Sequence, residues 1–183
     1  MSLSKAINTP IGTLNYTFIN GDGRDNLSGV AQYSTQLVLT EEEALPFIEE
    51  INALWASSGI KKQPKSMGYK TQDDGTIAFN FKTNVEINGK RNKVKVFDSK
   101  GKEADFSDIM IGNGTRGRVG ATMAIYEQPA MAGVTLYLNK IQVIELIEYE
   151  GGGSDEAFDE VQGGYTHTTA FEAEEAPVTI KKF

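Results

Sequence analysis

Side chains suited to an anionic, ring-bearing ligand recur at every second residue along parts of this chain. Arg116, Arg118 and Tyr126 occupy even positions of one stretch, whereas Val119 and Met123 occupy its apolar odd positions. Alternation with a period of two is typical of a half-buried β-strand. The cations and the tyrosine are therefore expected on one exposed face, where cations can neutralise phosphates and a tyrosine ring can stack on an unpaired base.

A second cationic face is predicted for the stretches 76–87 and 90–97, which flank Asn88-Gly89. Asn-Gly between two strand patterns favours a hairpin with a two-residue type I′ turn. The exposed face of that hairpin pairs Lys82 with Lys95, Asn84 with Lys93, and Glu86 with Arg91. Like charges directly opposite each other destabilise a sheet. The pattern favours an anionic ligand over this face, although a solvated face would also fit this hairpin taken alone.

The charge of the chain is unevenly distributed. The 183 residues have a net charge of −7, but residues 61–140 hold 14 basic and 8 acidic side chains. Residues 1–60 hold 2 basic and 7 acidic side chains, and residues 141–183 hold 2 and 10. A basic block between acidic ends is compatible with a nucleic-acid partner, which the total alone would disfavour.

The elements that must position these side chains are mostly short strands. One helix is expected after the strand pattern at 30–39, because Thr40 and Glu43 have capping-box spacing and Ala44, Ile51 and other apolar residues recur at helical intervals. A break in alternation near Asn139 and Lys140 predicts a bulge or bend. No segment approaches membrane-spanning length.

These patterns predict a mainly β protein with an OB-fold-like, five-stranded Greek-key barrel and one helix between early strands. The barrel is assigned to residues 1–150. Residues 151–183 follow a Gly-rich joint, lack periodicity and are expected to form a flexible acidic tail. The predicted DNA-binding residues are Lys82, Arg91, Lys93, Lys95, Arg116, Arg118, Tyr126 and Tyr137, and Tyr69 and Tyr33 are further candidates for stacking.

Other chemistries have weaker support in the residues of the chain. The chain has no Cys and one His, which leaves little for metal or nucleophile chemistry, and no cofactor is expected. Gly112 to Gly117 fits a dinucleotide-binding pattern, but strand alternation follows it where a helix is required. A Mg²⁺-dependent nuclease and an acidic adaptor that binds no nucleic acid remain alternatives. The carboxylates considered as Mg²⁺ ligands are Asp73, Asp74, Asp98, Asp105 and Asp108.

Several pieces of the chain, in order and at near-constant spacing, carry a family resemblance. They include DGTIAFNFK (74–82), VFDSKGK (96–102), IMIGNGTRGRV (109–119), AGVTLYL (132–138) and FDEVQGGY (158–165). Over about half its length the chain resembles the single-stranded DNA-binding proteins of short-tailed bacteriophages, the gene 2.5 protein type.

The resemblance implies an OB-fold without enzymatic activity that coats single-stranded DNA in phage replication and recombination, in the cytoplasm of the infected bacterium. It also implies strand annealing, and contacts of an acidic tail with the phage DNA polymerase and helicase–primase. Separately, residues 1–60 with their helix are expected either to provide a homodimer surface or to complete the barrel. The tail residues so implied are Asp155, Glu156, Asp159, Glu160, Glu172, Glu174, Glu175 and Phe183. Here Lys181 and Lys182 precede Phe183, unlike the family's acidic ending.

Overall fold

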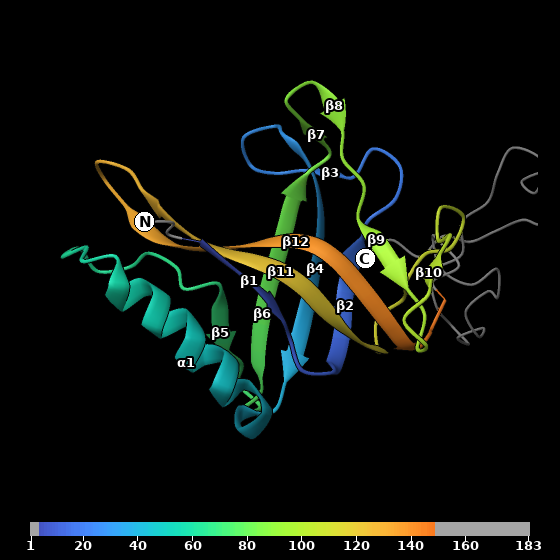
Figure 1. Ribbon diagram of the computed structural model, residues 1–183, viewed down its shortest axis with the longest axis horizontal. Helices are drawn as coiled ribbons and strands as arrows, with labels where there is room; N and C mark the ends of the chain where they lie inside the picture. Colours follow the sequence, from blue (N-terminus) through green and yellow to red (C-terminus); the bar gives the residue numbers. More distant parts are fainter. Residues whose placement is uncertain (1–3, 149–183) are drawn as a thin grey trace, which may run out of the picture. The chain divides into compact units, whose positions relative to one another are not determined.

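A computed structural model describes residues 4–148 of the chain. Five strands form a closed barrel, in which β2 pairs with β4, β4 with β6, β6 with β12, β12 with β11, and β11 again with β2 (Figure 1). These strands are β2 (Gly12–Phe18), β4 (Ala31–Leu39), β6 (Ile77–Asn84), β11 (Thr115–Glu127) and β12 (Ala132–Glu145). The predicted five-stranded OB-fold barrel is confirmed.

Shorter strands extend or flank the barrel. β1 pairs with β11, β9 continues the sheet from β12 to β10, β3 and β5 pair with β4 and β6, and β7 and β8 form a separate hairpin. Their bounds are β1 (Ser4–Asn8), β3 (Arg24–Asp25), β5 (Tyr69–Thr71), β7 (Glu86–Ile87), β8 (Lys90–Arg91), β9 (Lys95–Phe97) and β10 (Glu103–Ala104).

The helix α1 (Glu41–Ser57) lies between β4 and β6 in sequence, as predicted. Its first turn is capped as the spacing indicated: the Glu43 amide donates to Thr40 Oγ1 and the Thr40 amide donates to Glu43 Oε1, both at 3.2 Å. The helix begins at Glu41, well before Pro46. Its Phe47 ring packs on Phe79 of β6 with centroids 4.6 Å apart, which attaches the helix to the barrel core.

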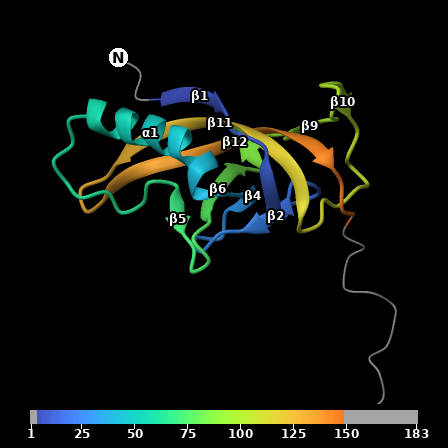
Figure 2. The same cartoon turned by 90° about the horizontal axis from the view of Figure 1, so that it is seen from below.

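Alternation along the strands places the core as the sequence indicated. Phe79 and Phe81 of β6 and Val119 and Met123 of β11 are all at most 1% exposed. The register of β11 against β12 shifts between Gly120 and Ala121, so that Asn139 is the extra residue of the predicted bulge. This bulge lets two long strands curve around the barrel (Figure 2).

The predicted hairpin is only partly right. The turn is confirmed, because Asn88 and Gly89 both have positive φ and Glu86 pairs with Arg91. The longer ladder is wrong: Lys82 lies opposite Ser34 and beside Tyr137, and Lys95 pairs with Lys140, whereas Asn84 lies opposite Gln32 and Lys93 lies outside the strands. The Asn92 amide side chain donates to Thr83 Oγ1 and to the Asn84 carbonyl, and the chain then turns away from β6.

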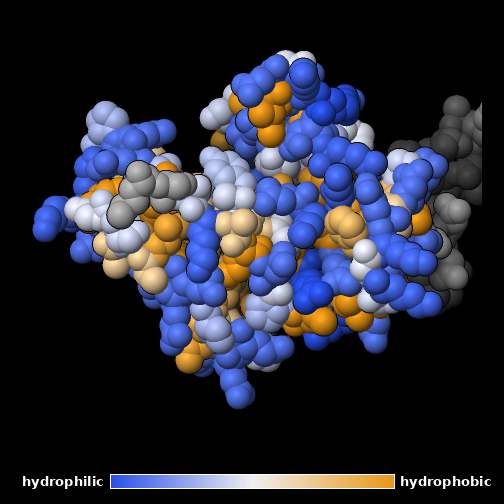
Figure 3. Space-filling view, in the orientation of Figure 1, coloured by the Kyte–Doolittle hydropathy of each residue, from blue (hydrophilic) through white to orange (hydrophobic). Residues whose placement is uncertain are grey.

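The predicted acidic tail, 151–183, lies outside the described residues. Within residues 4–148, no helix is long and apolar enough to cross a membrane. Hydrophilic residues cover most of the face shown in Figure 3, and hydrophobic residues appear there as small separate areas, as expected for a surface in contact with water.

Candidate nucleic-acid interface

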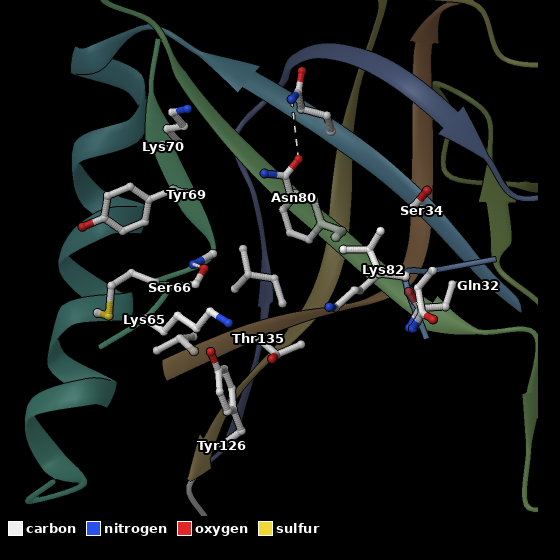
Figure 4. A pocket seen from close by; sticks show the side chains of 18 of the residues that line it. Gln32, Ser34, Lys65, Ser66, Tyr69, Lys70, Asn80, Lys82, Tyr126 and Thr135 are labelled. Carbon is white, nitrogen blue, oxygen red and sulfur yellow. Dashed lines mark hydrogen bonds between the residues drawn. The ribbon is translucent and has the colours of Figure 1, made fainter. Parts of the chain in front are cut away.

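A groove of about 1410 Å³ crosses the outer faces of β4 and β6 (Figure 4). Three irregular segments bound it: the loop between β3 and β4, the segment before β5, and the loop between β11 and β12. Its polar and aromatic lining residues are Tyr16, Asp25, Asn26, Ser28, Gln32, Ser34, Thr35, Gln36, Lys65, Ser66, Tyr69, Lys70, Asn80, Phe81, Lys82, Tyr126, Gln128 and Thr135.

The floor of the groove is polar because strand alternation turns every second residue of β4 and β6 outward. Gln32 and Ser34 of β4 lie opposite Asn84 and Lys82 of β6. Gln32 Nε2 donates to Asn84 Oδ1 at 2.9 Å. The floor therefore offers amide and hydroxyl groups around a single central ammonium group, that of Lys82.

One wall is a strap formed by residues 64–68. The Lys65 amide donates to the Ala132 carbonyl and the Val134 amide donates to the Ser66 carbonyl, both at 2.8 Å, and the Asn80 amide donates to the Gly68 carbonyl at 3.0 Å. The strap thus bridges β12 and β6. At Gly68, with φ of +83°, a Cβ atom would lie 2.7 Å from Leu136 Cγ, so this close approach requires glycine.

The strap and β5 bring to the groove two cations that the alternation of the strands did not predict, together with the candidate Tyr69. Lys65 and Lys70 are exposed, and Tyr69 is partly buried. In Figure 4 the ammonium groups of Lys65 and Lys82 point toward one another across the groove. Two cations that converge in this way favour an anion between them.

Two of the predicted binding residues line this groove, Lys82 and Tyr126. Tyr137 lies beside Lys82 in the parallel pairing of β12 with β6 and is 45% exposed, but it is not part of the groove lining. Farther along β12, the exposed Lys95 of β9 lies next to Lys140, and Arg118 of β11 lies next to Gln142. These side chains continue from the groove along the outer face of β12.

The remaining predicted cations lie elsewhere. Arg91 and Lys93 line a second pocket of about 400 Å³. The Arg91 guanidinium donates to Asp22 Oδ1 at 2.9 Å and to the Gly21 carbonyl at 2.8 Å. Arg116 donates to Thr13 Oγ1 at 3.1 Å. The structure therefore does not bring these three cations into the groove.

The groove residues missed from the sequence are Tyr16, Lys65 and Lys70. Of the two further candidate tyrosines, Tyr69 lines the groove, whereas Tyr33 is buried, at 4% exposure. The cluster KKQPKSMGYK (61–70) carries a signal, since it places four lysines and a tyrosine immediately before a predicted strand. It has no regular alternation, however, and so no face could be assigned to its side chains.

Two of the carboxylates considered as metal ligands, Asp74 and Asp98, accept hydrogen bonds within local turns. Hydrogen bonds from Thr76 hold the pKa of Asp74 below its ordinary value, and backbone hydrogen bonds from Lys102 and Lys100 do the same for the pKa of Asp98. Asp residues commonly stabilise turns in this way. Within residues 4–148, no group of three or more His, Cys, Asp or Glu side chains is placed to hold a metal ion.

The closed barrel, with one helix inserted between its second and third strands, defines the chain as an OB-fold protein. No model of a protein family matches it. It is 34% identical, over 146 residues, to the single-stranded DNA-binding protein of Enterobacteria phage T3; the match covers 72% of this chain and 62% of that protein. The chain spans less than two thirds of the length of the curated relatives it matches.

Solved structures of phage single-stranded DNA-binding proteins have the same fold. The chain superposes on gp2.5, a single-stranded DNA-binding protein encoded by bacteriophage T7, with a TM-score of 0.69 and 22% identity over 90% of this chain and 100% of that one. The single-stranded DNA-binding protein of bacteriophage Enc34, in complex with single-stranded DNA, gives a TM-score of 0.62 at 12% identity over 80% and 89% of the two chains. The resemblance to phage single-stranded DNA-binding proteins is thus confirmed.

Proposed function

We propose that this chain is a sequence-independent single-stranded DNA-binding protein that acts in phage DNA replication and recombination. One observation carries the proposal: the groove lies on the outer faces of the second and third barrel strands and between the adjoining loops. That surface is where OB-folds bind oligonucleotides. The names of the T3 and T7 relatives support the same function.

In the groove, the ammonium groups of Lys65, Lys70 and Lys82 neutralise phosphates, and the rings of Tyr69 and Tyr126 stack on bases. Stacking of one base on an aromatic ring contributes about 1–3 kcal/mol and tolerates any base. The floor amides can donate to and accept from exposed base edges. An unpaired strand offers these edges, whereas a duplex buries them in its base pairs.

We further propose that a longer strand leaves the groove past Tyr137 and follows the outer face of β12 toward Lys95 and Arg118. The support is the register, which puts Tyr137 beside Lys82 and Lys95 beside Lys140. Roles for Arg91, Lys93 and Arg116 in DNA binding stay predictions.

The experiment that tests the function is a gel shift of oligo-dT against a duplex of equal length. We expect oligo-dT to bind at lower protein concentration, and Tyr126→Ala to weaken that binding. Equal or tighter binding of the duplex would contradict the proposal. Labelled oligo-dT incubated with the protein and Mg²⁺ should stay intact, because the proposed function is not enzymatic; cleavage would favour a nuclease.

The proposed partners beyond DNA are the phage DNA polymerase and helicase–primase, contacted through acidic residues of the segment 151–183 in the cytoplasm of the infected bacterium. The support is the net negative charge of this segment and the likeness of FDEVQGGY (158–165) to the family. A pull-down of each partner with the full chain and with a 151–183 deletion tests this proposal. Equal capture by both forms would contradict it.

A further inference from the structure

Tyr16 of β2 has a backbone conformation that its residue type disfavours. Within residues 4–148, Tyr16 and Asn88 are the non-glycine residues with positive φ, at +50° and +52°. Asn88 occupies a type I′ turn that requires such an angle, whereas Tyr16 lies inside a strand. For an ordinary residue this left-handed conformation is strained. Strain of this kind persists only where the surroundings impose it, and it is concentrated at functional sites.

The strained residue reverses the alternation of β2. Gly12 and Leu14 are buried, so a regular strand would also turn Tyr16 inward. Instead the register of β2 against β4 breaks between Asn15 and Phe18, Tyr16 is 60% exposed, and Thr17 is buried in its place. The Thr17 hydroxyl is paired with that of Thr35 at 2.8 Å. This arrangement is unusual, because tyrosine is buried more often than threonine in folded proteins.

A distant loop fixes this conformation. The Tyr16 amide donates to Asn113 Oδ1 at 2.7 Å, and the Gly114 amide donates to Asn15 Oδ1 at 3.1 Å. The loop is itself anchored, because the Gly112 amide donates to the Ile147 carbonyl at 2.6 Å. The glycine-rich segment that fitted a dinucleotide pattern thus forms two reciprocal hydrogen bonds with the strained part of β2.

The exposed Tyr16 lines the groove. On the basis of the proposed function, we infer that Tyr16 stacks on an unpaired base of single-stranded DNA and that Asn113 is its positioning residue. The strained backbone turns the ring out of the core, and the hydrogen bond from the Tyr16 amide to Asn113 holds it there. The groove then has three tyrosines, since Tyr16 joins Tyr69 and Tyr126.

The first test compares two ligands of equal length, oligo-dT and an oligomer of abasic sugar-phosphate units. Tyr16→Ala should weaken oligo-dT binding by about 5- to 150-fold, the range expected for loss of one stacked base. It should leave binding of the abasic oligomer within about 2-fold, because no base is present to stack. Tyr16→Trp should retain oligo-dT affinity. Equal losses for both ligands would overturn the inference, as would an unchanged affinity for oligo-dT.

A second test separates stacking from folding. Tyr16→Gly removes the ring but tolerates positive φ, so it should melt at a higher temperature than Tyr16→Ala while binding oligo-dT as weakly. Asn88→Gly is the matched control, since it has the same backbone angle outside the groove, and its affinity should equal that of the unaltered protein. If Tyr16→Gly restored oligo-dT affinity, the loss in Tyr16→Ala would be structural and the inference would fail.

The positioning role is tested by a double-mutant cycle. Asn113→Ala should weaken oligo-dT binding in the unaltered protein but cause no further loss in the Tyr16→Ala background, because it acts through that ring. Additive losses would overturn the role of Asn113. Failure of the unaltered protein to bind oligo-dT would instead refute the proposed function, so the two failures are distinguishable.

Discussion

Removal of the three groove lysines should reduce the salt dependence of DNA binding by a calculable amount. The perturbation is the triple variant Lys65→Gln/Lys70→Gln/Lys82→Gln. Among residues 4–148, the ion pairs involve other cations, so none of these three ammonium groups is paired with a carboxylate of the barrel. On a single strand, each neutralised phosphate contributes about −0.7 to the slope of log affinity against log salt concentration. The slope should therefore become shallower by about 2.1.

This change is large enough to measure. A slope of about −2.1 corresponds to a roughly 18-fold loss of affinity between 50 and 200 mM salt, and the triple variant should lack that part of the salt response. Fluorescence anisotropy of labelled oligo-dT at several salt concentrations gives both slopes. The difference between them holds whatever other cations contact the strand.

The matched control is Lys90→Gln/Lys100→Gln/Lys102→Gln, which removes the same charge from exposed sites outside the groove lining. Its slope should equal that of the unaltered protein. An equal change in both triple variants would mean that net charge, not the groove, governs binding. An unchanged slope in the groove variant would refute the assignment of these lysines to phosphates.

Three further outcomes are expected. Gly68→Ala should lower the free energy of unfolding by about 1–3 kcal/mol, measured in urea, and by more than Gly75→Ala, which has a similar φ but open space around it. Thr40→Ala should lower that free energy by about 1 kcal/mol at pH 7. Hydrogen bonds from Thr40 lower the pKa of Glu43 from its ordinary value, so this contribution is fully present above that ordinary value and decreases as the pH falls through the lowered pKa; a destabilisation by Thr40→Ala that stayed constant throughout the acid range would contradict it. If the acidic segment 151–183 competes with DNA for the cations, its deletion should tighten oligo-dT binding, most at low salt; an affinity unchanged across salt concentrations would refute the competition.

Local signals predicted the local structure correctly. The capping box at Thr40 and the Asn-Gly turn each depend on a few adjacent residues, and both are present in the structure. The bulge at Asn139 was also predictable, because it interrupts an otherwise regular alternation. Such features need no knowledge of distant partners.

The choice of strand partners was not predictable in the same way. After the turn, the Asn92 side chain donates a hydrogen bond to Thr83 Oγ1 of β6. The next strand, β9, then pairs with β12 instead of β6. In the groove, Lys82 and Tyr126 followed from strand alternation. Tyr16 could not be predicted in this way, because alternation along β2 places its side chain inward with Leu14. Its outward orientation depends on a hydrogen bond to Asn113, which is distant in sequence.

The closure of the barrel has a consequence for how the protein responds to its ligand. β6 and β12 meet at a single register pair, Lys82 with Tyr137, whereas β11 and β12 are paired along most of their length. This joint has the fewest paired residues of the five in the barrel, and the strap 64–68 spans it beside the groove. Single-stranded DNA bound in the groove would contact both sides of this joint and stabilise its closed form. DNA should therefore slow amide hydrogen exchange at the joint more than at the β11–β12 ladder.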